Sequence, residues 1–433
     1  MIKRVDFLLP ISSQYGALHH FTKKIYEAFV RRGLTCRLLN PEEHFSVPMA
    51  DPPDMTFAVN GVPHDPEGNL LCDLIHIPHL CFIVDPPFRF LELLRSPHIA
   101  IACDDRFNCE VLRSNGFART CFFPYGVEPE LSPSANNERP FDVTMIASYI
   151  DYQANKALWP SKYAPPLVEA MEEAVVATIQ EQGLSFIAAL MNALNVRIVR
   201  GEMEGVEIDL VRILIDLELY LKGWDRVQLV KAVTDAEVHV IGGVNTGWTQ
   251  ALAGMDNVHF HPSVSYEETL EIMKKSKIVL NSSIKNKEGA SERVFSTLAT
   301  GALPLTTQTC YLAEHFIDEE SILFYQPNAY DRINGKINKI LANEKLTKTI
   351  VEKGRAEVMQ AHTWDSRVNE LFKKFNLKII YTKYEANPII KTFTPIELTP
   401  PNPKSKACKI SAKDIENIAT LPKNTPTNPK SMR

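Results

Sequence analysis

Residues 281–304 read NSSIKNKEGASERVFSTLATGALP and carry the strongest structural signal in the chain. The apolar run before them predicts a buried strand that ends near Asn281, and a polar loop follows it. Gly289 opens a helix, which Gly301 ends because glycine readily adopts the left-handed conformation of a helix stop. Another apolar run follows at once. Strand, loop, helix and strand in this order predict a parallel α/β sheet.

The loop and the first helical turn of this stretch carry an unusual set of charges. Lys285, Lys287 and Arg293 flank the free backbone amides that a helix beginning at Gly289 presents. Free amides, the helix dipole and cations together are typical of a diphosphate site. Glu288 lies in the same loop, where it can accept hydrogen bonds from sugar hydroxyls. The alternative for the two lysines is a solvated loop.

Short apolar runs alternate with helical stretches on both sides of this segment. In the first third, strands are predicted at residues 4–10, 35–40, 55–61, 80–85, 99–105 and 121–126, and helices at 16–32, 88–94 and 106–115. Later strands are predicted at 143–148, 238–243, 278–283, 303–307 and 322–326. Buried parallel strands read as such continuous apolar runs. The fold class is therefore α/β, with two Rossmann-like doubly wound domains that face a cleft.

The domain boundaries follow from changes in composition. We predict a first domain over residues 1–127, a turn-rich linker over 128–140 and a second domain over 141–375. Residues 152–234 have helical apolar spacing with little strand signal, which predicts a helical insertion in the second domain. Residues 385–433 are rich in proline and lysine and predict a disordered tail.

Composition excludes several classes of protein. The chain has 433 residues, of which 45% are hydrophobic, and a net charge of −5, so a basic field for nucleic acid is absent. Its 8 cysteines form no CxxC pair, which indicates a reducing, cytoplasmic location and no zinc site. The most apolar stretch, 184–196, is shorter than a bilayer span, and the first ten residues lack the features of a signal peptide.

Ligands of open α/β sheets bind beyond the carboxyl ends of the strands. Beyond the first strand, Gly16 opens a helix whose amides can bind an anion or a hydroxyl; the alternative is a simple turn. Beyond the fourth, Asp85 precedes two prolines and can accept a substrate hydrogen bond or act as a base. The alternative for Asp85 is a helix N-cap.

Two further turns follow strands of the predicted second domain. The first is glycine-rich, so its backbone can approach a ligand closely, although it is not a GxGxxG dinucleotide fingerprint. The second precedes a helix that begins at Tyr266, where a planar base can rest on backbone groups; the alternative is a structural turn. The residues singled out in these turns are Gly242, Gly243, Asn245, His261, Ser263 and Val264.

The decisive stretch resembles the donor-site signature of GT-B glycosyltransferases. Glu288-Gly289 and residues 299–301 match the ends of the retaining group 1 pattern. Residues 293–302, RVFSTLATGA, are similar to the spore-maturation (CgeB-like) branch, which reads Arg-Val-Phe-Glu-x-Leu-Ala-x-Gly-Ala. Ser296 stands where both branches carry the Glu that binds the nucleotide ribose. Glu292, one helical turn earlier, is a candidate to replace it.

Other segments resemble the same family in the right order. Residues 143–148 look like the first strand of the nucleotide-binding domain and place Ser148 beside the donor. Residues 261–266 are similar to the loop that holds the base, 123–129 to the interdomain turn and 361–367 to the closing C-terminal helix. The resemblance covers roughly residues 1–375, with 152–234 poorly matched.

The resemblance implies a transferase that moves a sugar from a nucleotide-sugar donor to a glycan, lipid or protein acceptor. The nucleotide-sugar is a co-substrate, and no metal or other cofactor is implied. Arg293 with Lys285 or Lys287 stabilises the leaving diphosphate, and the sugar is transferred with retention of configuration. If the enzyme inverts instead, Asp85 or His19 is the candidate base.

Two other functions fit the same fold. One is a different GT-B enzyme, such as a sugar-nucleotide epimerase or a phosphorylase. The other is a catalytically weak or inactive binding or scaffold protein, which Ser296 favours. The donor sugar, the base, the acceptor, the oligomeric state and peripheral association with a membrane are left open by the sequence.

Overall fold

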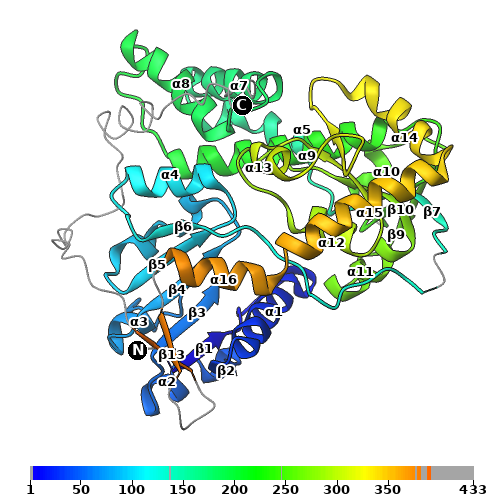
Figure 1. The fold of residues 1–433 in the computed structure, drawn as a ribbon. Helices are drawn as coiled ribbons and strands as arrows, with labels where there is room; N and C mark the ends of the chain where they lie inside the picture. The colour runs from blue at the N-terminus through cyan, green and yellow to red at the C-terminus, as the bar shows by residue number, and fades with distance from the viewer. Residues whose placement is uncertain (1–2, 136–137, 245, 376–377, 382–387, 392–433) are drawn as a thin grey trace, which may run out of the picture.

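The computed structural model describes residues 3–135, 138–244, 246–375, 378–381 and 388–391 and contains two parallel sheets (Figure 1). The first sheet has six strands in the order β2-β1-β3-β4-β5-β6. These strands are β1 (Arg4–Leu8), β2 (Thr35–Leu39), β3 (Met55–Val59), β4 (His79–Ile83), β5 (Ile99–Cys103) and β6 (Thr120–Phe122). Its main helices are α1 (Ala17–Arg31) and α4 (Arg106–Ser114). Because β3, β4 and β5 are buried on both faces, they read as continuous apolar runs.

The second sheet also has six parallel strands, in the order β12-β11-β10-β7-β8-β9. The strands are β7 (Phe141–Ile146), β8 (Val238–Ile241), β9 (Val258–His261), β10 (Ser276–Asn281), β11 (Leu303–Thr307) and β12 (Leu323–Tyr325). Its helices are α10 (Gly247–Ala251), α11 (Tyr266–Lys274), α12 (Glu292–Ala299), α13 (Cys310–His315), α14 (Ile333–Leu341) and α15 (Glu344–Ala361). The predicted fold class, two Rossmann-like sheets with flanking helices, is confirmed.

Five helices lie between β7 and β8, where the sequence has helical spacing. They are α5 (Tyr152–Ala157), α6 (Trp159–Lys162), α7 (Pro165–Gln180), α8 (Phe186–Val199) and α9 (Leu210–Lys231). Their core takes in Phe88 from the first domain and Ile284 from the second. The helical segment therefore packs against both domains beside the gap that separates them.

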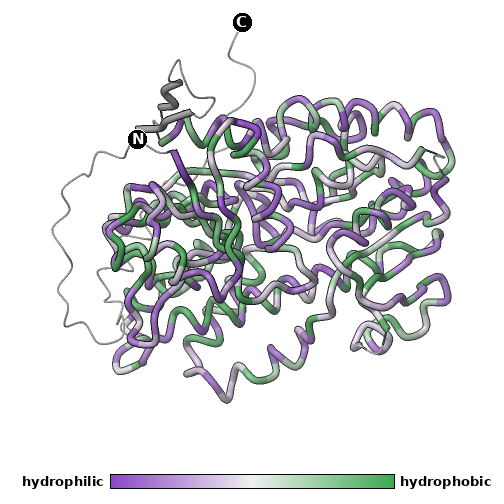
Figure 2. The backbone as a smooth tube through the Cα atoms, turned by 90° about the horizontal axis from the view of Figure 1, so that it is seen from below, coloured by the Kyte–Doolittle hydropathy of each residue, from purple (hydrophilic) through white to green (hydrophobic). Residues whose placement is uncertain are grey.

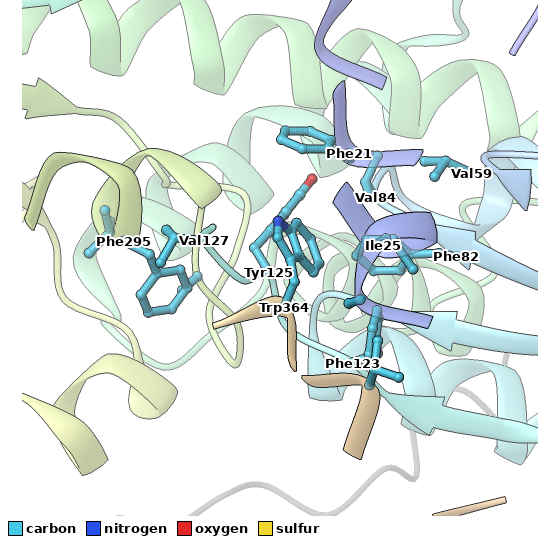
Figure 3. Close-up of a cluster of buried hydrophobic side chains, with 14 of the residues drawn as sticks. Phe21, Ile25, Val59, Phe82, Val84, Phe123, Tyr125, Val127, Phe295 and Trp364 are labelled. Carbon is cyan, nitrogen blue, oxygen red and sulfur yellow. The ribbon is translucent and has the colours of Figure 1, made fainter. Parts of the chain in front are cut away.

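The last long helix, α16 (Trp364–Lys374), leaves the second domain and packs on α1 of the first (Figure 1). The rings of Phe29 and Phe372 lie 5.3 Å apart, and Trp364 lies with Tyr125 in the cluster of Figure 3. The Trp364 N–H donates to the Val127 carbonyl at 2.9 Å. A side chain on Gly126 would lie 2.8 Å from the Trp364 nitrogen, so this crossing of two chain segments requires glycine.

Two segments differ from their predictions. The predicted helix at 88–94 is a 3₁₀ helix over Pro87–Arg95, which begins at a proline because the first helical turn tolerates one, and it is kinked at Phe90 (φ −131°). Strands β13 (Lys378–Tyr381) and β14 (Pro388–Lys391) pair antiparallel, so β14 falls inside the segment predicted as a disordered tail. The rest of that predicted tail lies outside the described residues.

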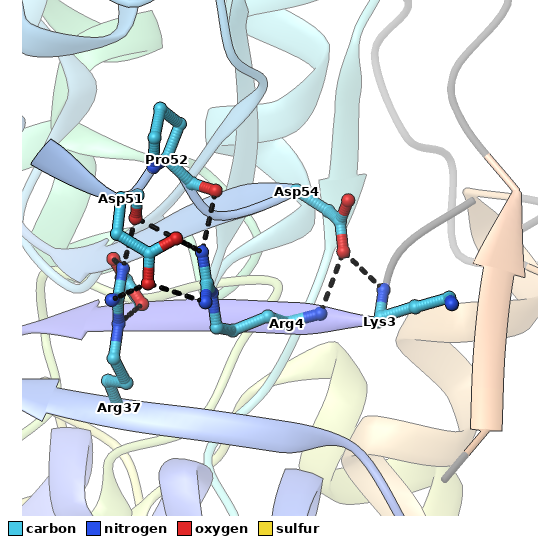
Figure 4. A network of polar contacts seen from close by, with 7 residues as sticks. Lys3, Arg4, Arg37, Asp51, Pro52 and Asp54 are labelled. Atoms are coloured by element: carbon cyan, nitrogen blue, oxygen red, sulfur yellow. Dashed lines mark hydrogen bonds and ion pairs between the residues drawn. The ribbon is translucent and has the colours of Figure 1, made fainter. Parts of the chain in front are cut away.

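Strands β3, β4 and β5 of the first sheet are largely apolar, whereas β1 and β2 on one side of it carry charged residues; Figure 2 shows the hydropathy of each residue along the backbone. Figure 4 shows the charged residues of this side, where Arg4 and Arg37 converge on Asp51. Arg37 also donates to both oxygens of Asp6, at 2.7 and 2.6 Å, and Asp6 is 0% exposed. The pair keeps a fully buried carboxylate satisfied.

Replacing Arg37 by methionine is expected to lower the free energy of unfolding by about 3–5 kcal/mol, because Asp6 is then a buried charge without a partner. Denaturation in urea measures the change. Arg31→Met is the control: its ion pair with Asp365 is 40% and 36% exposed, so about 1 kcal/mol or less is expected. Equal losses for the two variants would contradict this account of Asp6.

Candidate active site

A cleft separates the two domains at the carboxyl ends of both sets of strands. Its empty volume is about 1240 Å³, counting the part open to solvent. Residues that follow β4 and β6 line one wall, and residues that follow β7, β8, β9 and β10 line the other. The cleft therefore has the position in which open α/β sheets bind ligands.

Two arginines lie close together on the second-domain wall. Arg226 comes from α9, and its Nη1 donates to the Ser148 carbonyl at 2.8 Å. Arg293 lies in the first turn of α12, whose N-terminus is capped by Ser291, and its Nε is buried without a hydrogen-bond partner among the described residues. Burial, and then the charge of Arg293, lower the pKa of Arg226 to about 10. An anion between the two guanidinium groups would relieve their repulsion.

Lys285, unlike the two arginines, is surrounded by carboxylates. Burial alone would lower its pKa, but the charges of Glu218, Asp85, Asp104 and Glu292 outweigh burial and raise it. Its Nζ lies 3.9 Å from Asp85 Oδ1, so this ion pair joins the two domains across the cleft. The charge of Lys285 is therefore already compensated by carboxylates of the protein.

Asp85 is held on the first-domain wall by Asn60, which follows β3. Asn60 Nδ2 donates to Asp85 Oδ2 at 2.8 Å, and Asn60 Oδ1 accepts from the Val84 N–H at 2.9 Å. Asn60 has a φ of 56°, a left-handed conformation that asparagine tolerates. The Asp85 side chain is 42% exposed and caps no helix, so the N-cap alternative is wrong.

The loop after β1 reaches across the mouth of the cleft. Tyr15 has a φ of 56° and is followed by Gly16 at 77°, a turn that projects the tyrosine ring toward the second domain. The Tyr15 hydroxyl lies 3.2 Å from Ser148 Oγ and 3.4 Å from Ser263 Oγ. Side chains of the first domain thus contribute to the wall on which Gly242 also lies.

The structure brings together some of the predicted site residues and separates others. The cleft is lined by Asp85, Ser148, Gly242, Ser263, Val264, Lys285 and Arg293. It is not lined by Gly16, His19, Gly243, His261, Lys287, Glu288, Gly289 and Ser296. Asn245 lies outside the described residues.

Lys287 points away from the cleft, which corrects its prediction as a phosphate-binding lysine. The residue is 4% exposed, and its Nζ donates to the Thr178 carbonyl of α7 at 3.3 Å. Burial lowers its pKa to about 8, against the opposing charge of Asp225. The alternative of a solvated loop is also wrong for Lys287, because the helical segment covers it.

Glu288 and Gly289 form a contact between the domains. The Glu288 N–H donates to Asp105 Oδ2 at 3.1 Å, and Gly289 forms a β-bridge with Asp105. A side chain on Gly289 would lie 2.2 Å from the Asp104 carbonyl oxygen. Glycine is needed here because the segments around Gly289 and Asp104 pass close to each other. The prediction that Gly289 contacts the donor is therefore corrected: it contacts the first domain.

The side chains of three other predicted site residues contact groups of the protein itself. Ser296 is 2% exposed, and its hydroxyl lies 3.4 Å from that of Tyr266. His19 Nε2 is 2.8 Å from the Pro10 carbonyl oxygen, and His261 Nε2 is 2.9 Å from Nδ1 of His239.

The remaining predicted positions are backbone ones. At Gly243 a side chain would lie 2.7 Å from the Phe260 ring, so glycine is needed for packing. Gly16 is the residue before α1. Its φ of 77° is a left-handed conformation that glycine adopts at no steric cost.

The sequence-based analysis missed Arg226 and Tyr15 as cleft residues and gave Glu292 only a secondary place. A signal for Arg226 does exist in α9, where Glu218, Lys222 and Arg226 follow at intervals of four residues in a largely apolar helix. Residues four apart share one helix face. A charged stripe on a helix that is otherwise buried indicates a polar cavity next to it.

One group of described side chains has the make-up of a metal site, but its proton arrangement does not fit. His315, Glu357 and His362 lie close together, away from the cleft residues. Arg367 donates to Nδ1 of His362, which leaves the ring proton on Nε2. A metal needs the free electron pair of a ring nitrogen, but on His362 the Nδ1 pair accepts from Arg367 and Nε2, which lies 3.5 Å from Glu357 Oε1, carries the proton.

Comparison with known proteins finds a family similar to part of the second domain. The family model described as "Glycosyl transferase-like" matches residues 226–373, which begin at Arg226 and include α12. Residues 226–373 of this chain are therefore similar to that family. The predicted glycosyltransferase resemblance is confirmed, whereas the spore-maturation branch stays a prediction. No match to a curated protein sequence was found.

Solved structures share the two-domain fold. HepE from Anabaena, in complex with UDP and glucose, has 10% identity and a TM-score of 0.53, over 86% of this chain and 99% of that one. Sucrose-phosphate synthase from Thermosynechococcus elongatus has 10% identity and a TM-score of 0.52, over 86% and 98%. A glycosyltransferase from Rickettsia africae has 10% identity and a TM-score of 0.50, over 86% and 97%. The chain therefore has the GT-B fold, and none of its described helices is long and apolar enough to cross a bilayer.

Proposed function

We propose that this protein transfers a sugar from a nucleoside-diphosphate sugar to an acceptor hydroxyl, with the diphosphate bound between Arg226 and Arg293. The observation that carries the proposal is the pair of cleft arginines. Neither forms a close ion pair among the described residues: the nearest carboxylate oxygen, that of Glu292, lies 3.9 Å from Arg293, and the hydrogen bonds of the two side chains go to the uncharged Ser148 carbonyl and Asn281 Oδ1. Cations that repel each other beside a helix N-terminus favour a ligand with two adjacent negative groups.

The nucleoside part of the donor fits beyond the arginines, toward the ends of β7, β8 and β9. Gly242, Ser263 and Val264 supply backbone groups and a hydroxyl there, and Tyr15 lies opposite them. Glu292 is the carboxylate of α12 that reaches the cleft, whereas Ser296 is buried under Tyr266. We assign the hydrogen bonds to donor hydroxyls to Glu292.

The proposed chemistry uses charges of the protein at the leaving group. As the glycosidic bond breaks, negative charge grows on the diphosphate, and fixed guanidinium groups stabilise that charge without rearranging. Arg226 and Arg293 supply this stabilisation, while Lys285, which lines the same cleft, faces Asp85 at 3.9 Å. We propose that no metal is needed and that configuration is retained. Proton NMR of the newly formed glycosidic bond tests the second point.

A thermal-shift screen tests the proposed function. Millimolar UDP, GDP, ADP, CMP and dTDP are added to the full chain and to Arg293→Ala. A nucleoside diphosphate that binds the native state raises its Tm by mass action, and the rise is expected to disappear in Arg293→Ala. Arg200→Ala is the control, since its side chain is 65% exposed on the helical segment. A rise that persists in Arg293→Ala, or no rise with any nucleotide, contradicts the proposal.

A further inference from the structure

The two walls of the cleft differ in charge. The second domain and α9 contribute Arg226, Lys285, Glu292 and Arg293. Among the described lining residues, the first domain contributes Asp85 as its one charged side chain. If the donor lies on the second-domain wall, as proposed above, the acceptor meets a wall whose charge is a single carboxylate.

That carboxylate is fixed in direction and available to a ligand. Asn60 occupies Asp85 Oδ2 at 2.8 Å, and Oδ1 faces Lys285 at 3.9 Å, beyond hydrogen-bond distance. Carboxylate oxygens accept hydrogen bonds from hydroxyl groups and repel phosphates and other carboxylates. Asp85 therefore suits an acceptor that presents a hydroxyl and carries no negative charge beside it.

Lys285 does not reverse this preference. Its ammonium group already balances several carboxylates, namely Glu218, Asp85, Asp104 and Glu292. An anionic acceptor that used Lys285 would have to displace Asp85 and would still lie beside it. The cation nearest to the acceptor wall is thus unavailable to a phosphate of the acceptor.

The rest of the first-domain wall is apolar or uncharged. Leu18, Phe21 and Val84 line it, and the rings of Phe21 and Tyr125 lie 5.3 Å apart (Figure 3). Tyr15 is 44% exposed at the mouth of the cleft. Such a surface suits the C–H face of a sugar ring or an apolar aglycone.

From these contacts we infer that the acceptor is an uncharged, hydroxyl-bearing compound, such as a neutral sugar residue or glycoside, and not a phosphorylated or carboxylated one. The inference rests on the proposed function for the position of the donor. Its physical basis, a carboxylate between apolar side chains, belongs to the first domain alone.

The test measures binding of paired ligands to the full chain by saturation-transfer NMR, with and without the nucleoside diphosphate that raises the Tm. Each pair is a methyl glycoside and the matching sugar 6-phosphate or uronate, for glucose, galactose, mannose and N-acetylglucosamine. At least one methyl glycoside is expected to bind ten or more times tighter than its charged counterparts. Asp85→Asn is expected to reduce that ratio several-fold, while Glu110→Gln, an exposed carboxylate of the same domain, leaves it unchanged.

Three results would overturn the inference. The first is a sugar phosphate or uronate that binds more tightly than the matching methyl glycoside, and the second is a ratio of the two affinities that Asp85→Asn leaves unchanged. The third is that no methyl glycoside binds. The nucleotide-dependent rise in Tm is measured separately on the same samples, for the full chain and for Asp85→Asn. Absence of that rise in the full chain counts against the proposed function, whereas a rise present in both proteins together with the wrong acceptor preference counts against the inference alone.

Discussion

Arg293→Ala is expected to lower the rate of sugar transfer by about 10²–10³-fold, the usual effect of removing one fixed donor from a developing negative charge. The side chain is 21% exposed, its Nε makes no hydrogen bond among the described residues and its Nη1 makes a long one of 3.5 Å to Asn281 Oδ1, so little stability depends on it. The Tm of the ligand-free variant is therefore expected to stay close to that of the parent. Initial rates of nucleoside-diphosphate release, measured with donor in excess, give the change.

Arg293→Lys separates charge from geometry in the same experiment. Lysine keeps the positive charge but lacks the planar fork that binds two oxygens at once, so an intermediate loss is expected. Arg200→Ala controls for the general loss of an arginine. A fall of less than about fivefold in Arg293→Ala would be too small for a group that stabilises the leaving diphosphate directly.

Arg226→Met is expected to raise the Kd of the nucleoside diphosphate by about 10–100-fold, because each tenfold change corresponds to about 1.4 kcal/mol and a charge-assisted hydrogen bond contributes about that much. Methionine keeps most of the length of the side chain and removes its charge. Isothermal titration calorimetry measures the change. The matched control is Arg212→Met, on the exposed side of the same helix α9. Equal affinities for Arg226→Met and the parent would remove Arg226 from the site.

The position of Arg226 follows from how α9 is anchored to the second domain. The neighbouring Asp225 is buried and accepts from Ser282 Oγ at 2.5 Å and from the Tyr325 hydroxyl at 2.8 Å. On the same helix, Glu218 pairs with Arg89 of the first domain at 2.7 Å. The inserted helices therefore hold Arg226, a cation of the proposed donor site, in a position fixed by contacts of α9 with both domains.

The strands were predictable because their signal is local. Met55–Val59 and Ile99–Cys103 are buried along their whole length, and in a parallel sheet such burial requires an unbroken apolar run. The helix of the stretch 281–304 and its end at Gly301 were predictable for a similar reason, but it begins at Glu292 after the Ser291 cap and not at the predicted Gly289, which forms a β-bridge with Asp105. Asp85 was found because the end of a strand and two prolines fix its direction.

The directions of side chains in the loop after β10 were not predictable. Lys285 and Lys287 are two residues apart, and only the packing of α7 against the loop decides that Lys287 points away from the cleft. Gly289 has a sequence signal that fits both a ligand approach and a domain contact, and the position of Asp104 decides between them. Arg226 depends on the rotation of α9, which a helix buried on several faces does not reveal through its apolar spacing.

The most direct test of the central claim is a crystal structure of the full chain with the nucleoside diphosphate selected by the thermal-shift screen. Both phosphates are expected in the cleft, with oxygens within about 3 Å of the guanidinium groups of Arg226 and Arg293. Lys285 is predicted to keep its contact with Asp85, and Lys287 is predicted to stay on α7. Phosphates bound at Lys287, or anywhere outside contact with the two arginines, would contradict the account.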